Sequence, residues 1–263
     1  MTTIPFDMFQ NIWTIFLLVL VRITGMFFLS PIFGRRNIPN YFKIGFCFIF
    51  SVITANSITM PDLTQYVSLT AYVILIAKEL LIGLMMGFIS YMLFSSIHIA
   101  GQLIDMRIGF GMVSMFDPVT NVQIPITADF YVIIATVMML ITDSHHLLIH
   151  AIVDSYNILP IGEAIFGGAV IEQTFKLFTS VFELGFKIAA PITVSILITD
   201  ISLGIISKSM PQMNVFMLGM PIKIILGLTI IFITISAFKG IVNVIIKGTY
   251  EEIYKLLRQA KGS

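Results

Sequence analysis

The chain has 263 residues, of which 57% are hydrophobic and only 11% are charged, and its mean hydropathy is +0.99. A soluble domain carries about 25% charged residues, so this composition excludes a single water-exposed globule and requires a bilayer or a large apolar assembly around the chain. The 15 Lys and Arg residues balance the 14 Asp and Glu residues, and nothing in the charge indicates a nucleic-acid partner.

The first predicted spanning helix is Ile12–Phe33, an apolar stretch interrupted by Arg22. Its length meets the requirement of about 20 mainly apolar residues for a span. The residues before it have neither a basic segment nor a small-residue cleavage site, so we expect this helix to stay in the mature protein. A loop containing Gly34 and Pro39 leads to a shorter apolar run, Ile44–Ile58.

The middle of the chain predicts two long helical regions around a glycine-rich break. An apolar run extends from Val67 to about Ile104, and the pattern then breaks over Gly109–Pro125. A helix is predicted over Ile126–Ile141, and a second helical stretch follows it and ends near Leu159.

The last third begins after a loop at Gly162–Gly168. A helix is predicted over Ile171–Ser207, with a possible kink at Pro191, and an irregular segment follows at Pro211–Pro221. The final apolar run is Ile222–Ile246, and an amphipathic tail, Lys247–Ser263, comes after it. The fold class is therefore all-α, a polytopic helical membrane protein with about six apolar segments, some short or broken. We expect one domain over residues 1–263.

The orientation of this domain is left open by its charges. Cytoplasmic loops carry an excess of Lys and Arg, and Arg35, Arg36 and Lys43 favour a cytoplasmic first loop. Six crossings would then place both termini outside. The basic tail instead favours a cytoplasmic C-terminus, with Lys247, Lys255, Arg258 and Lys261.

Arg22 lies about ten residues from either end of its helix, too deep for an easy route to the membrane surface. An arginine at the centre of a bilayer raises the free energy of insertion by roughly 2.5–3.5 kcal/mol. We expect it to face protein and to meet a carboxylate or helix-end carbonyls, and snorkelling to the surface is the alternative.

Glu79, Gly83, Gly87 and Tyr91 recur every four residues and so share one helix face. Small residues at this spacing let two helix backbones approach closely in membranes. An ionisable group on the same stripe must face protein, which strengthens the interpretation. We predict a helix-packing face here.

Two further polar stripes have open interpretations. Glu172, Lys176, Thr179, Glu183 and Lys187 indicate either a solvated helix face or packing against a neighbouring subunit, with each Glu four residues before a Lys. The second stripe consists of Asp143, His146, His150 and Asp154. Such side chains could hold a divalent metal, but polar residues at a helix start commonly just contact water or a partner.

No catalytic motif is present in the sequence. There is no GxSxG, no phosphate loop, and no nucleophile with an evident base. The lone cysteine, Cys47, lies in an apolar run and is expected to be a packing residue. We expect neither enzymatic activity nor a cofactor or bound metal.

Several short motifs along almost the whole chain resemble the FliR family, also known as SctT in virulence secretion systems. The N-terminal helix with Arg22 and the stripe at Glu79, Gly83 and Gly87 belong to this resemblance. The remaining motifs are Ser30-Pro31-Ile32-Phe33-Gly34-Arg35, Ala100-Gly101-Gln102, Asp117-Pro118, Asp154-Ser155 with Pro160 and Gly162, Ala190-Pro191, and Met210-Pro211-Gln212 with Asn214. By resemblance, Pro211, Gln212 and Asn214 of the last motif are expected to take part in assembly.

The resemblance implies a structural subunit of the flagellar type III export gate in the bacterial inner membrane, at the basal body. It implies FliP-like and FliQ-like partners, an FlhB-like partner in addition, and unfolded flagellar proteins as the transported substrates. A single copy per complex is implied. The runner-up is a small-molecule secondary transporter of about six helices, and a metalloenzyme using His146 and His150 is a third possibility.

In this family the central loop contributes to a plug that seals the pore. By resemblance the corresponding residues are Phe110, Met112, Met115 and Phe116, with Met112 and Met115 standing where aromatic residues are expected. Flexible apolar Met side chains can repack around varied surfaces, which suits a seal that opens on unfolded polypeptide. The alternative is an ordinary apolar loop in a core.

Overall fold

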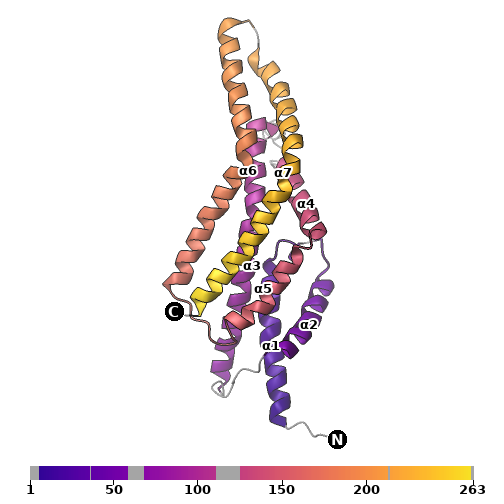
Figure 1. The fold of residues 1–263 in the computed structure, drawn as a ribbon, viewed down its shortest axis with the longest axis vertical. Helices are drawn as coiled ribbons and strands as arrows, with labels where there is room; N and C mark the ends of the chain where they lie inside the picture. The colour runs from indigo at the N-terminus through magenta and orange to yellow at the C-terminus, as the bar shows by residue number, and fades with distance from the viewer. Residues whose placement is uncertain (1–5, 36, 59–67, 111–124, 213, 262–263) are drawn as a thin grey trace, which may run out of the picture. The chain divides into compact units, whose positions relative to one another are not determined.

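The computed structural model describes residues 6–35, 37–58, 68–110, 125–212 and 214–261. Within these ranges the chain forms seven helices and no strand (Figure 1). They are α1 Phe6–Leu29, α2 Asn40–Ser57, α3 Leu69–Ile108, α4 Ile126–Ile141, α5 His145–Ile158, α6 Gly168–Ser209 and α7 Val215–Ala260. The predicted all-α class is confirmed, with one helix more than the expected six.

The first two helices differ from their predicted limits because of prolines. α1 ends at Leu29 and not at Phe33, since the residue before Pro31 is disfavoured in the helical region. α2 begins at Asn40, four residues earlier than predicted, directly after Pro39. Proline supplies a suitable φ at a helix start, and its φ here is −58°.

The prediction that residues 211–221 are irregular holds for the turn at Pro211 and Gln212 but is wrong from Val215 onward. α7 begins at Val215 and runs without a break through Pro221 to Ala260. Asn214 starts it, because its Oδ1 accepts the Met217 N–H at 3.2 Å, as N-cap side chains do. The tail is the amphipathic end of α7, with buried positions at Ile253, Leu256, Leu257 and Ala260.

Four of the described helices are long and apolar enough to cross a membrane, namely α1, α3, α6 and α7. The pair α4 and α5 qualifies as a fifth span if the two are counted as one broken helix. The chain is therefore a multi-pass membrane protein.

The chain divides into two compact units. Unit 1 comprises Met1–Leu93, His145–Leu177 and Lys247–Ser263, and unit 2 comprises Phe94–Ser144 and Phe178–Ile246. The three longest helices, α3, α6 and α7, each contribute a part to both units. A single domain over 1–263 stays a prediction.

Each unit has its own apolar core built from positions three or four residues apart, the spacing of one helix face. In unit 1 these positions include Leu18, Val19, Ile23, Met26, Leu75, Ile82, Met86, Leu148, Ala151 and Ile152. In unit 2 they include Ile97, Ile104, Ile108, Tyr131, Ala135, Val181, Ile196 and Val242.

In unit 2, a carboxylate fastens the start of α4 to the last turns of α3. Asp105 on α3 is buried, and its Oδ1 and Oδ2 both accept the Thr127 N–H, at 3.0 and 3.1 Å. Gly101, one turn earlier, lies against Ala128, so closely that a Cβ atom on Gly101 would fall 2.2 Å from the Ala128 Cα. Asp105 thus acts as an N-cap from another helix.

Candidate functional site

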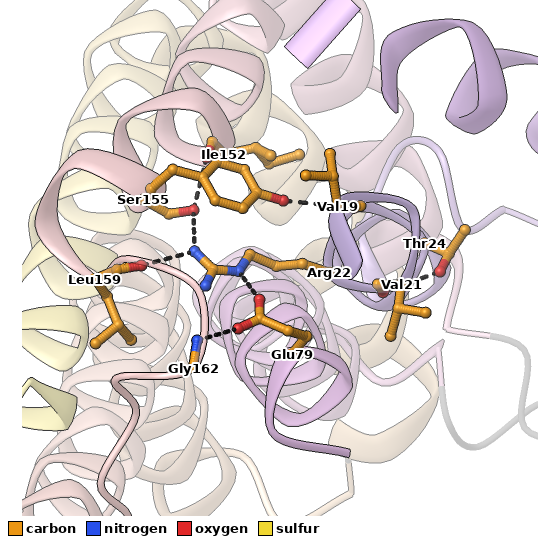
Figure 2. A network of polar contacts seen from close by, with 10 residues as sticks. Val19, Val21, Arg22, Thr24, Glu79, Ile152, Ser155, Leu159 and Gly162 are labelled. Atoms are coloured by element: carbon orange, nitrogen blue, oxygen red, sulfur yellow. Dashed lines mark hydrogen bonds and ion pairs between the residues drawn. The ribbon is translucent and has the colours of Figure 1, made fainter. Parts of the chain in front are cut away.

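The candidate site is a buried polar network in unit 1, centred on Arg22 of α1 (Figure 2). The Arg22 side chain is 0% exposed, although it sits within an apolar helix, two turns before its end. Its helix neighbours Leu18, Val19, Ile23 and Met26 are also buried, so it points to the packed face. An arginine in this position needs compensation from protein groups, because no water reaches it.

Glu79 of α3 provides the counter-charge. The Arg22 Nε donates to Glu79 Oε2 at 2.6 Å, and neither side chain is exposed. Glu79 shares its buried face with Leu75 and Ile82, one turn away on either side, and with Met86, two turns away. Removing two charges from water is unfavourable by several kcal/mol per ion, and only good geometry with further hydrogen bonds can offset that.

Those further bonds come from α5 and the residue that follows it. The Arg22 Nη1 donates to the Ser155 Oγ and to the Leu159 carbonyl oxygen, both at 3.1 Å (Figure 2). Leu159 follows the last residue of α5, so its carbonyl is one of those that a helix end leaves without an intrahelical donor. The positive charge therefore sits at the negative end of the α5 dipole, where it is favoured.

An aromatic ring completes the surroundings of the guanidinium. The Arg22 Cζ lies 4.2 Å from the ring centroid of Tyr156, a cation–π distance. Among the described residues, Arg22 Nη2 has no hydrogen-bond acceptor, so the ring adds an electrostatic partner for the cation as a whole. The Tyr156 hydroxyl donates back to the Val19 carbonyl at 3.4 Å, which ties α5 to α1.

The second oxygen of Glu79 holds the turn after α5. Glu79 Oε1 accepts the Gly162 N–H at 3.1 Å, and the neighbouring Lys78 Nζ donates to the Gly162 carbonyl at 3.3 Å. Gly162 has φ +89°, a region that a residue with a Cβ rarely adopts. Lys78 and Glu79, adjacent on α3, thus hold this turn through both the carbonyl and the N–H of Gly162.

The stripe containing Gly83 and Gly87 is the surface on which α1 and α3 meet. A Cβ on Gly83 would fall 2.1 Å from the Arg22 carbonyl oxygen, and one on Gly87 would fall 2.7 Å from that of Met26. Gly25 on α1 also faces the backbone of α3, since a Cβ there would fall 3.0 Å from the Leu80 oxygen. This close approach brings the short Glu79 side chain within reach of Arg22.

The turn after α5 also receives the end of α7. Beyond the turn, the Ile165 N–H donates to the carbonyl of Ala260, the last residue of α7, at 2.7 Å. The Tyr250 and Tyr254 hydroxyls on α7 both donate to Asp154 Oδ2, at 3.0 and 2.9 Å. Arg22 and Glu79 therefore anchor a turn against which α5, α6 and α7 are arranged within unit 1.

The remaining residues singled out from sequence lie elsewhere. Phe110 is half-buried just after α3 in unit 2, whereas Met112, Met115 and Phe116 lie outside the described residues. Pro211 and Gln212 are exposed after α6, and Asn214 is the cap of α7.

The two polar stripes also have defined places. The pairs Glu172–Lys176 and Glu183–Lys187 form ion pairs at 2.7 and 2.6 Å on exposed faces of α6. Asp143 precedes α5 with φ +53° and so does not share its helix face, and Asp154 accepts the two tyrosine hydroxyls.

Sequence reasoning did not assign Ser155, Tyr156, Gly162 or Gly25 a contact with Arg22 or its helix. Ser155 and Gly162 were visible as motif residues, and the signal that could have linked them is the need of a buried arginine for several acceptors. The groups that meet here are an ion pair, hydroxyls and backbone, and their contacts join α1, α3, α5 and the turn after α5.

Comparison with known proteins agrees with this architecture. The model of the family described as bacterial export proteins, family 1, matches residues 13–249. The chain is 33% identical to the flagellar biosynthetic protein FliR of Bacillus subtilis strain 168 over 250 residues, 94% of this chain and 96% of that protein. It is 28% identical to the protein of that name from Aquifex aeolicus strain VF5, covering 91% of each. The corresponding protein of Escherichia coli K12 is 25% identical, over 90% of this chain and 89% of its own length.

Proposed function

The chain belongs to the bacterial export proteins, family 1, in its FliR branch, and we propose that it is a structural, pore-forming subunit of the flagellar type III protein export gate. As a member of this branch it is a component of the flagellar export apparatus. The observation that carries the finer proposal is the match over residues 13–249, which leaves no large part of the chain for another activity.

The buried network supports a structural role. Arg22 and Glu79 bond to each other, and both form hydrogen bonds with α5 or the turn that follows it. A transporter would instead be expected to present intramembrane charges to a water-filled path. We therefore assign Arg22, Glu79, Gly83 and Gly87 to helix packing, and Pro211, Gln212 and Asn214 to assembly with neighbouring subunits.

The partners proposed are FliP-like and FliQ-like membrane subunits, with an FlhB-like subunit in addition, in the inner membrane at the flagellar basal body. Exposed apolar side chains on α6 support such contacts, among them Phe175, Phe182 and Phe186. The substrates are unfolded flagellar proteins, which the chain would pass without chemistry of its own.

Co-purification tests this role directly. A tagged chain is extracted from native membranes in mild detergent, and the mass and composition of the complex are measured. A gate subunit should bring down several copies of small helical membrane proteins. Recovery of the chain alone, or as a homo-oligomer, would favour a small-molecule transporter and contradict the gate.

For the pore seal we propose Phe110, Met112, Met115 and Phe116, on the basis of sequence and resemblance. Truncating Met112 and Met115 together to Ala removes apolar contact, which should make the assembled complex leak small dyes. A tight mutant complex would refute a dominant sealing role for the two methionines. A mutant that fails to assemble would instead indicate that they belong to a core.

A further inference from the structure

A pocket of about 290 Å³ lies in unit 1 between the end of α1 and the start of α2. Five phenylalanines line it, among them Phe27, Phe33 and Phe46. The Phe33 and Phe46 rings stack at 5.6 Å, and Phe27 meets Phe33 edge-on at 4.6 Å. Because these rings brace one another, the pocket has firm walls that suit a flexible apolar chain.

A single ammonium group lies among these aromatic walls. Lys43 lines the pocket and is half-buried, and its Nζ donates to the Gly34 carbonyl at 3.2 Å. That bond positions the cation and leaves two of its three N–H donors for another acceptor. An apolar pocket with one fixed cation fits a molecule that has both an acyl chain and a negative charge.

The segment of the chain that lines the pocket carries charge of one sign. Between Asp7 and Asp62 the sequence contains four basic residues and no acidic one. Arg22 is neutralised by Glu79 within the core, whereas Lys43 lies in the first turn of α2. α2 also begins without a side-chain cap, so its N-terminal dipole adds positive potential. The mouth is therefore complementary to an anion.

The pocket lies near the end of an apolar span, where lipid headgroups are expected. The apolar span of α1 ends at Leu29, and the pocket cation lies beyond it. Large aromatic side chains stand exposed beside the mouth, with Phe28 76%, Tyr41 80% and Phe42 57% exposed. Exposed aromatic residues at the end of a span are typical of the membrane–water interface.

We infer that this pocket binds an anionic phospholipid, with part of an acyl chain between Phe27, Phe33 and Phe46 and the phosphate at Lys43. Basic pockets between membrane helices bind such headgroups. This site is separate from the Arg22–Glu79 network and does not depend on the proposed export function.

The test uses the full chain in detergent, titrated with phosphatidylglycerol, with phosphatidylcholine of the same acyl chains, and with inorganic phosphate. Bound lipid is counted by native mass spectrometry, and the thermal midpoint is followed in parallel. Phosphatidylglycerol should bind and raise the midpoint more than phosphatidylcholine does, and inorganic phosphate should do neither.

Variants locate the site. Lys43→Gln should weaken phosphatidylglycerol binding about fivefold, the value of one basic residue near an anionic headgroup. Lys43→Arg should retain binding, and Lys261→Gln, an equal loss of charge at the exposed end of the chain, should leave it unchanged. Thr24→Phe, which fills the pocket from α1, should reduce lipid binding while Lys43 remains.

Three results would overturn the inference. If the unaltered chain bound the two lipids equally, the charge of the headgroup would play no part in binding. Binding of inorganic phosphate as tight as that of phosphatidylglycerol would indicate a free-anion site. Undiminished lipid binding by both Lys43→Gln and Thr24→Phe would place any bound lipid elsewhere on the protein.

Discussion

A Cβ atom on Gly83 would fall 2.1 Å from the carbonyl oxygen of Arg22, so α3 and α1 touch backbone to backbone at the level of the buried ion pair. The contact is with main-chain atoms, which cannot move aside as a flexible side chain would. Helix approach and charge pairing are thus one structural feature, since the same turn of α1 supplies the carbonyl and the guanidinium.

Gly83→Ala should lower the free energy of unfolding in detergent by about 1–3 kcal/mol, the range for inserting bulk into a packed core. Insertion into the membrane should be unchanged, because the residue remains apolar. The matched control is Gly45→Ala on α2, where an added Cβ meets nothing within 4 Å. There alanine should be neutral or stabilising by up to about 1 kcal/mol. Equal effects at both positions would contradict the close contact.

The sequence predicted that Arg22 and Glu79 face protein, but not which groups they contact. A charge in the middle of an apolar helix has to meet protein, so the inward direction of Arg22 and Glu79 follows from composition alone. Their contact joins residues 57 positions apart. Ser155 and Leu159 lie more than 130 positions from Arg22. Such contacts depend on how helices pack, and no local pattern specifies that.

The fold shows the same division. α4 has the predicted limits, since its apolar run is bounded by Pro125 and the polar residues at 142–145. The error at α7 has a local cause. Pro211 and Pro221 were both interpreted as breaks, but Asn214 caps a new helix between them. Pro221 lies inside that helix, where it removes one backbone hydrogen bond without ending it, as membrane helices allow.

The strained turn after α5 gives a second test. Gly162→Ala would place a Cβ at φ +89° and should lower the free energy of unfolding by roughly 1–3 kcal/mol. Gly167→Ala is the control, because an added Cβ there has no neighbour within 4 Å and the residue has no positive φ. Thermal unfolding of the two variants in the same detergent separates strain from a general loss of glycine. A Gly162→Ala chain as stable as the control would show that the turn relaxes freely.

The cap provided by Asp105 predicts an effect in unit 2. Asp105→Ala removes both acceptors of the Thr127 N–H and leaves the start of α4 uncapped. We expect a loss of about 1–2 kcal/mol, the upper range for an N-cap. Asp105→Asn keeps one carbonyl acceptor and should lose less. Asp129→Ala, at an exposed position on the first turn of α4, serves as the comparison. If hydrogen exchange at the first turn of α4 were equally fast in Asp105→Ala and Asp129→Ala, the capping role would be excluded.

The ion pair itself allows the sharpest test, because a buried pair and a buried single charge behave differently. Arg22→Met removes the cation and leaves Glu79 buried without a counter-charge, which should lower the free energy of unfolding by about 3–5 kcal/mol. Glu79→Leu should lower the free energy of unfolding by a similar amount, because it leaves the Arg22 cation buried without a counter-charge. The double variant has no buried charge, and apolar replacements of a buried pair are often neutral, so it should recover much of the loss.

The exposed pair Glu183–Lys187 is the control, and Lys187→Met should change stability by less than about 1 kcal/mol. All four variants should insert, with Arg22→Met inserting at least as well as the unaltered chain. Unfolding is followed by denaturant titration in one detergent, and the coupling energy is taken from the cycle. A double variant that loses the sum of the two single losses would show that Arg22 and Glu79 act independently, and that the contact between α1 and α3 is maintained by the glycines alone.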